Sequence, residues 1–242
     1  MWRVCCASPR QWNYVITHLD QLRNIYCKKD ALNVFLSTSA LISSATESEV
    51  EQIKLILGLL SGFGIIADYV DGDDGISFRY KNQQIFQCLK HAGTLLELYT
   101  AVVARAQFKD DERIYQDVLT GVMIGWNTEP GEKEVTNEVD VVMMNGAVPV
   151  FISCKNGDLE KEELFKLYTV ASNFGGPYAR MALVASSLHE LGPKGEHICL
   201  RAAELGIQVV DDVDNIEEAD FGEILGNLPS GTQKRVAYTP QK

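Results

Sequence analysis

The sequence predicts an α/β protein in which a mixed sheet flanked by helices follows a small domain of helices and a β-hairpin. Three observations lead to this prediction. Residues 137–157 hold two runs of strand-forming residues around Asn145-Gly146, the strongest two-residue signal for a hairpin turn. Residues 179–210 follow the order strand, helix, strand. Residues 1–82 place helices before a second pair of strands.

The length of 242 residues suits a small domain followed by a medium one, and we place the boundary between residues 82 and 83. No run of about 18 apolar residues occurs, so no membrane-spanning helix is expected. The start, MWRVCCASPR, lacks the apolar core of a secretory signal peptide. The six cysteines show no zinc-site spacing and are expected to be reduced thiols. A cytoplasmic protein is therefore expected.

The N-terminal domain is expected to be helical and winged-helix-like. The apolar periodicity predicts a helix over 9–27, and Thr46 with Glu49 forms a capping box for a helix that ends at Gly62. The segments GIIADYV and ISFRY then form a strand pair, whereas residues 31–42 are apolar without a clear assignment. This outline suits DNA contact, or a linker or dimerisation module. Eight Lys and Arg against nine Asp and Glu in residues 1–82 favour the linker or dimerisation module.

The second domain, residues 83–242, is read from caps and periodicity. Gly93 is expected to kink its first helix, and Gly206 suits the end of its last one. The predicted elements are a helix over 83–106, a strand over 117–126, the hairpin, a helix over 159–173, a strand over 179–185, a helix over 196–205 and a strand over 207–210.

The hairpin register brings charged side chains together. With Asn145-Gly146 as the turn, Met144 pairs with Ala147, and Asp140 then lies opposite Phe151. Side chains alternate between the faces of a strand, and opposed residues share a face. One face therefore gathers two carboxylates, a hydroxyl and an ammonium group: Glu138, which lies opposite Ser153, with Asp140, Ser153 and Lys155.

This grouping suits phosphodiester chemistry. A hard cation such as Mg²⁺ takes one or two carboxylates, with waters and substrate phosphates as its other ligands. A lysine beside it can orient the attacking water or neutralise phosphate charge. The alternative is a solvated strand face whose charged side chains have no catalytic role.

The residues of this hairpin carry a family resemblance. NEVDVV and VFISCK resemble the D…(D/E)xK core of the restriction-endonuclease-like, or PD-(D/E)xK, superfamily. Asp140 matches the aspartate and Lys155 the lysine, whereas Ser153 stands where the family has an acid. Glu138 is expected to supply the missing charge. The segment GTLLELY resembles the helix whose acid reaches the metal, so the resemblance makes Glu97 a third candidate ligand.

More narrowly, the chain resembles the C-terminal part of CRISPR-associated nucleases that join a CARF sensor domain for cyclic oligoadenylate to a restriction-like nuclease. GTLLELYTA, GVMIGW, the hairpin and SNFGGPYARMALVAS carry this resemblance. It implies an endonuclease of antiviral defence, dependent on Mg²⁺ or Mn²⁺, that acts on DNA or RNA as a homodimer. The 82 preceding residues are too few for a CARF domain and a winged helix. Cyclic oligoadenylate binding is therefore expected only through a sensor domain absent from this chain.

The resemblance and the register together assign expected roles. Asp140, Glu138 and Glu97 are the expected metal ligands; Lys155, Asp140 and Glu138 are the expected catalytic residues; Ser153 and Lys166 are expected to contact substrate. Residues 83–242 carry 14 basic and 24 acidic residues, a balance of −10 that repels a polyanion at long range. That charge and Ser153 support the alternative of a non-catalytic restriction-like scaffold or interaction module. The sequence leaves open whether the substrate is single-stranded or double-stranded and what activates the enzyme.

Overall fold

The computed structural model describes residues 21–22, 32–90, 93–125, 136–157 and 159–231. The chain divides into two compact units, residues 1–95 and residues 96–242. The boundary predicted after residue 82 falls where helix α5 (Gln83–Lys90) begins. That helix belongs to the first unit, where the ring of Phe86 makes an edge contact with Tyr80 at 5.3 Å between centroids.

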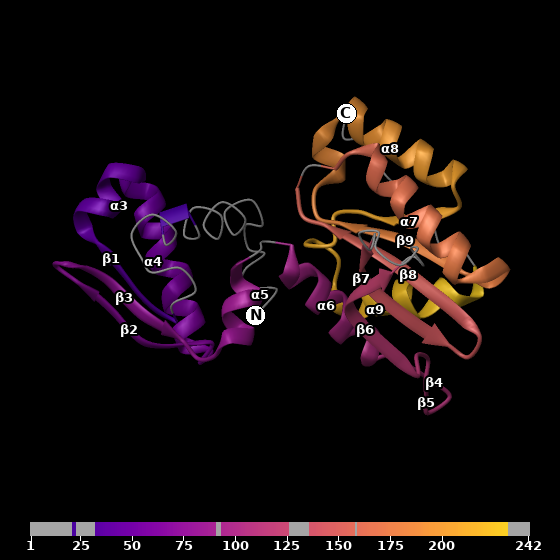
Figure 1. Cartoon of the computed structure of the whole chain (residues 1–242), viewed down its shortest axis with the longest axis horizontal. Coiled ribbons are helices and arrows are strands. Elements are labelled where there is room, and N and C mark those ends of the chain that lie inside the picture. The colour runs from indigo at the N-terminus through magenta and orange to yellow at the C-terminus, as the bar shows by residue number, and fades with distance from the viewer. Residues whose placement is uncertain (1–20, 23–31, 91–92, 126–135, 158, 232–242) are drawn as a thin grey trace, which may run out of the picture. The chain divides into compact units, whose positions relative to one another are not determined.

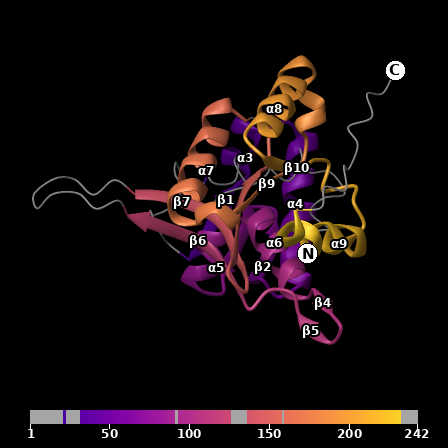
Figure 2. The same ribbon diagram turned by 90° about the vertical axis from the view of Figure 1, so that its right-hand side faces the viewer.

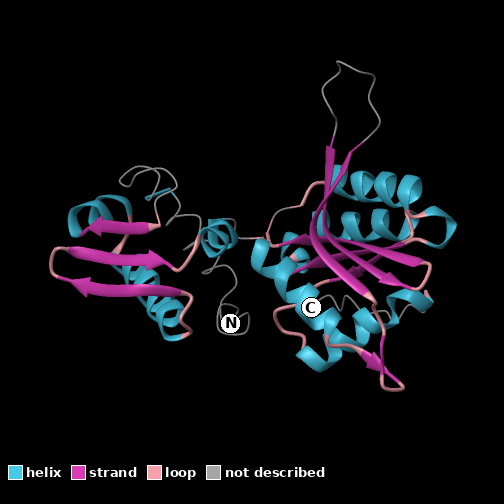
Figure 3. Ribbon diagram, turned by 60° about the horizontal axis from the view of Figure 1, so that its bottom comes forward, coloured by secondary structure: helices cyan, strands magenta, loops and turns pink. Residues whose placement is uncertain are grey.

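The first unit packs two helices beside a three-stranded antiparallel sheet, drawn as magenta arrows in Figure 3. The predicted capping box is present, because the Thr46 hydroxyl and the Glu49 carboxylate each accept a backbone N–H of the other residue. Residues 33–44, all but the last two of which lie in the unassigned stretch, form a strand and a short helix capped by Ser37. The helix predicted over 9–27 lies outside the described residues, apart from residues 21–22. The elements are β1 (Asn33–Ser37), α3 (Thr38–Ser44), α4 (Glu47–Gly62), β2 (Ile66–Gly72) and β3 (Gly75–Tyr80), with sheet order β1-β3-β2.

The helix predicted over 83–106 is divided into two helices, α5 in the first unit and α6, which begins at the boundary between the units. The other strands and helices predicted for the second domain are present, with ends that differ by a few residues. Helix α6 begins at Thr94, next to the predicted kink at Gly93. A two-stranded ribbon that the sequence did not predict precedes the main sheet. The elements are α6 (Thr94–Arg105), β4 (Phe108–Lys109), β5 (Glu112–Arg113), β6 (Asp117–Gly125), β7 (Thr136–Asn145), β8 (Val148–Lys155), α7 (Lys161–Phe174), β9 (Arg180–Ala185), α8 (Pro193–Glu204), β10 (Ile207–Val210) and α9 (Glu218–Asn227), with single 3₁₀ turns at Gly176–Tyr178, Leu188–Leu191 and Leu228–Ser230.

The main sheet is mixed, as predicted. Its order is β10-β9-β8-β7-β6, in which β6, β7 and β8 are antiparallel and β8, β9 and β10 are parallel. Helices α7 and α8 lie on one face, and α6 and α9 lie on the other (Figures 1 and 2). On the α7 face, Phe151 and Leu183 pack with Leu164 and Ile198. On the opposite side, the Tyr99 ring of α6 stacks on Phe221 of α9 with 5.5 Å between centroids.

The hairpin register differs from the prediction by two residues. Asn145 pairs with Val148, so Gly146 and Ala147 are the turn, and Phe151 lies opposite Val142 and not Asp140. Only Gly146 of these turn residues has positive φ, +56°, as in a type II′ turn, whereas type I′ needs positive φ at both positions. The Asn145 amide donates to the carbonyl of Ile114 at 2.5 Å, which holds Asn145 in the strand. A shift of two preserves the predicted faces of Ser153 and Lys155 on β8. On β7, however, Val139 packs with Phe151 in the cluster on the α7 face, although alternation from Val142, the partner of Phe151, would place it on the opposite face.

Among the helices of the described residues, none combines the length and the hydropathy needed to cross a bilayer.

Candidate active site

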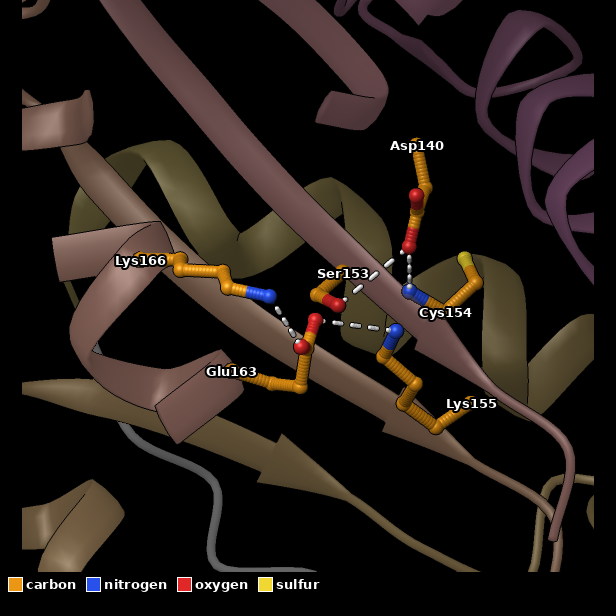
Figure 4. A network of polar contacts seen from close by, with 6 residues as sticks. All are labelled: Asp140, Ser153, Cys154, Lys155, Glu163 and Lys166. Carbon is orange, nitrogen blue, oxygen red and sulfur yellow. Dashed lines mark hydrogen bonds and ion pairs between the residues drawn. The ribbon is translucent and has the colours of Figure 1, made fainter. Parts of the chain in front are cut away.

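The candidate site begins where β7 and β8 separate. The regular pairing of the two strands starts at the turn and ends at Val141 opposite Ile152. Beyond that pair, the backbone N–H of Cys154 donates to Oδ2 of Asp140 at 2.6 Å, and the Ser153 hydroxyl donates to the same oxygen at 3.2 Å (Figure 4). The Asp140 carboxylate thus accepts a hydrogen bond from a backbone N–H that would pair with a β7 carbonyl if the two strands continued side by side. Asp140 is therefore fixed by two donors before any ligand arrives.

Lys155, the last residue of β8, projects toward helix α7 because side chains alternate along the strand. Its Nζ lies 3.2 Å from Oε2 of Glu163, in the first turn of α7. Oε1 of Glu163 accepts a hydrogen bond from Lys166 at 2.6 Å (Figure 4). The pKa of Glu163 is lowered, because hydrogen bonds and charge from Lys166 and Lys155 outweigh the opposing effect of burial. Sequence reasoning missed Glu163; its signal was an acid three residues before Lys166.

A cavity of about 400 Å³ joins these groups. Five of the predicted site residues line it, and Glu163 lines it with them. The wall is completed by apolar side chains that anchor α7 to the sheet, such as Leu167 and Val170. The lining residues with charged or hydroxyl side chains are Glu138, Asp140, Ser153, Lys155, Glu163 and Lys166.

Glu97, the third predicted acid, lies in the first turn of α6 and does not line this cavity. Burial raises its pKa to about 7, and the negative charges of Asp140 and Glu138 add to that effect. This influence places Glu97 within electrostatic range of both carboxylates. The carboxylate is therefore a neighbour of the cavity on the α6 side of the sheet.

The donor set suits a divalent cation that keeps several waters. Within the described residues, no three His, Cys, Asp or Glu side chains converge as a preformed metal cage. Mg²⁺ and Mn²⁺ sites in enzymes that act on phosphates need one or two carboxylates, with waters and substrate oxygens completing the shell. Asp140, with further acids lining the same cavity, meets that smaller requirement.

Solved structures resemble this fold. Protein VC1899 from Vibrio cholerae matches with a TM-score of 0.66 and 19% identity over 95% of this chain and 55% of its own. Can2 from Sulfobacillus thermosulfidooxidans, solved in complex with cyclic tetra-adenylate, matches with a TM-score of 0.54 and 16% identity over 93% of this chain and 56% of its own. The chain thus spans about half the length of these two proteins. No curated protein matches significantly.

The family is shown by a sequence match. The model of the Card1-like endonuclease domain matches residues 89–227, more than half of the chain. That range contains α6, the hairpin and α7, and hence every residue of the candidate site. The nuclease resemblance predicted from the hairpin is confirmed. The chain belongs to the Card1-like endonuclease domain family.

Proposed function

We propose that this protein is an endonuclease, dependent on Mg²⁺ or Mn²⁺, that hydrolyses phosphodiester bonds of DNA or RNA in CRISPR-linked antiviral defence. One observation carries the proposal. Asp140 and Lys155, the two residues that fit the nuclease motif, line one cavity inside the segment matched by the endonuclease family. A divalent cation bound there would polarise the scissile phosphate and lower the pKa of an attacking water.

Asp140 would hold the cation, with Glu138 and Glu97 as the further acids available to it. Its carboxylate is oriented by the Ser153 hydroxyl and the Cys154 N–H, so little reorganisation is needed when substrate arrives. Lys155 would orient the attacking water or stabilise the developing negative charge. The Ser153 hydroxyl and the Lys166 ammonium group line the same cavity, where both would contact substrate phosphate.

The resemblance to CARF-domain nucleases also suggests the partners of this protein. We expect a homodimer, in the cytoplasm, whose activity is controlled by cyclic oligoadenylate through a sensor domain outside this chain. Can2 was solved with such a ligand, cyclic tetra-adenylate, and this chain covers 56% of that protein. Residues 1–82, with their near-neutral charge, would serve as a winged-helix-like linker or dimerisation module ahead of the nuclease domain at 83–242.

A second candidate function is a restriction-like scaffold or interaction module without catalysis. Two observations favour it. Ser153 stands two residues before the lysine, where the motif has an acidic residue. Within the described residues, no set of three potential ligands is preassembled.

Cleavage assays separate the two functions. Supercoiled plasmid, single-stranded DNA and RNA are incubated with the protein in Mn²⁺, Mg²⁺ or EDTA, beside Asp140→Ala and Lys155→Ala. We expect metal-dependent cutting of at least one substrate and a loss of about 100-fold or more in each variant, as for other groups that stabilise transition-state charge. Glu162→Gln, an exposed acid outside the cavity lining, is the control. A well-folded protein that cuts none of these substrates would favour the scaffold.

A further inference from the structure

The candidate site lacks one negative charge on the strand that carries its lysine. Position 153 lies two residues before Lys155 and on the same face, so a side chain there reaches the same cavity. Ser153 fills that position with a neutral hydroxyl that donates to Asp140. A hydroxyl offers a cation no formal charge, and hard divalent cations select sites by their carboxylates. If the site binds a cation, another element must supply the charge.

Glu163 lies where it can supply a negative charge to the cavity that Asp140, Ser153 and Lys155 line. It is on α7, and its carboxylate points at strand β8, where Ser153 and Lys155 project (Figure 4). Lys155 Nζ lies 3.2 Å from Oε2 of Glu163, and the two side chains are only 27% and 31% exposed. Both residues line the cavity that contains Asp140.

The contact with Lys155 distinguishes Glu163 from an ordinary helix-surface acid. Its pair with Lys166 is a local i, i+3 contact with a lysine that is 62% exposed, and such pairs contribute little to stability. The pair with Lys155 instead joins a helix to the strand that bears the motif. Glu162, the preceding residue on the same helix turn, is exposed and does not line the cavity.

We propose that Glu163 supplies from α7 the acidic side chain that β8 lacks at Ser153, and that Asp140 and Glu163 together hold the catalytic divalent cation. This proposal rests on the proposed nuclease function and names a ligand that the motif does not predict. It assigns the compensating charge to Glu163, whereas the strand pattern assigned it to Glu138. Glu163 is favoured because it contacts Lys155, the motif's own lysine.

The first test measures cation binding without catalysis. Mn²⁺ affinity is determined by titration calorimetry for the full chain, Glu163→Gln and Glu138→Gln, with Glu162→Gln as the matched control. We expect Glu163→Gln to weaken Mn²⁺ binding by about tenfold or more, because a carboxylate ligand becomes a neutral amide. Glu162→Gln is expected to bind as the unmodified chain does. Circular dichroism confirms that each variant is folded.

The second test moves the charge back to the strand. Ser153→Glu is combined with Glu163→Gln, so that the acid stands where the motif has it. We expect this double variant to recover most of the Mn²⁺ affinity and of the metal-dependent cleavage lost in Glu163→Gln. Ser153→Asp in the same background serves if the longer side chain disturbs folding.

The outcomes separate this proposal from the function on which it rests. Glu163→Gln that cuts more slowly but binds Mn²⁺ normally would overturn it, because Glu163 would then only position Lys155. Loss of affinity with no recovery in either folded double variant, or a loss confined to Glu138→Gln, would overturn it as well. If the unmodified chain neither binds Mn²⁺ nor cuts, the nuclease function itself fails.

Discussion

At the scale of single residues, Cys154 contributes its backbone to the candidate site and its side chain to the core. Its N–H donates to Asp140, whereas its thiol is buried on the α6 side, with Sγ 3.8 Å from the Thr100 hydroxyl oxygen. Burial raises the pKa of the thiol well above its ordinary value, and the nearby Asp140 charge adds to the effect. A thiol that stays protonated is a poor nucleophile and a poor metal ligand.

Glu97 gives a prediction about stability and pH in the metal-free protein. Its folded pKa is about 7, raised from 4.5 by burial first and then by Asp140 and Glu138. The folded state therefore binds this proton more tightly than the unfolded state does. Stability from the protonated form is fully present below about pH 4.5 and is lost as pH rises through about 7.

Glu97→Gln is thus expected to stabilise the protein at pH 8. The gain in the free energy of unfolding should be about 1 to 2 kcal/mol. Converting the whole pKa shift at about 1.36 kcal/mol per unit would give a larger value, which is reduced because the side chain is partly solvated. At pH 5.5 the gain should fall to less than half. Urea unfolding in EDTA at both pH values measures it, with Glu162→Gln as the exposed control. An equal gain at both pH values would show that charge is not its cause.

At the scale of elements, the sequence located the hairpin but not its register. Two strand runs around Asn-Gly are a local signal, so the position of the hairpin was predictable. The turn is also held by distant groups, since the Asn145 amide donates to Ile114 and Gly146 N–H donates to Gln116. Such contacts appear only after the chain folds. Because the error was two residues, Ser153 and Lys155 kept their predicted face, whereas Val139 of β7 lies on the α7 face and departs from the predicted alternation.

Asp140 and Lys155 could be found from the strand pattern, but Glu163 could not. The prediction began the helix at residue 159, whereas α7 begins at Lys161. The apolar residues Leu164 and Leu167 indicate which face of this helix packs on the sheet, and both are buried there. They do not indicate which strand residue the first turn of the helix lies against. The partner of Lys155 therefore became visible only when α7 was packed against β8.

Gly175 sets how closely the end of α7 approaches the sheet. A Cβ at this position would lie 2.6 Å from the Phe151 ring and 2.8 Å from the Ala171 carbonyl oxygen. We expect Gly175→Ala to lower the free energy of unfolding by about 1 to 3 kcal/mol, because the helix end must shift away from β8. Thermal and urea unfolding measure the change. Ser172→Ala, exposed on the same helix, should stay within about 0.5 kcal/mol of the unmodified chain.

If Gly175→Ala were as stable as Ser172→Ala, the close packing of α7 on Phe151 would be contradicted.

At the scale of the whole molecule, charge opposes the proposed substrate. The chain carries −11, so a nucleic acid is repelled at long range and must be held by local contacts. Two of the local cations, Lys155 and Lys166, line the cavity. Binding strength should then depend on a few lysines and on salt, and much less on nucleotide sequence.

Lys166 provides the test of this electrostatic argument. Its side chain is 62% exposed and lines the cavity, so it can contact a substrate phosphate and release a counterion. Lys166→Ala should weaken binding of every oligonucleotide sequence and reduce the slope of log affinity against log salt by about 0.7 to 1. Fluorescence anisotropy in EDTA, over a series of salt concentrations, measures both. Lys161→Ala is the matched control, because Lys161 is exposed on the same helix but does not line the cavity. Equal effects of the two substitutions would mean that the nucleic acid backbone contacts α7 broadly, and that the cavity does not fix its path.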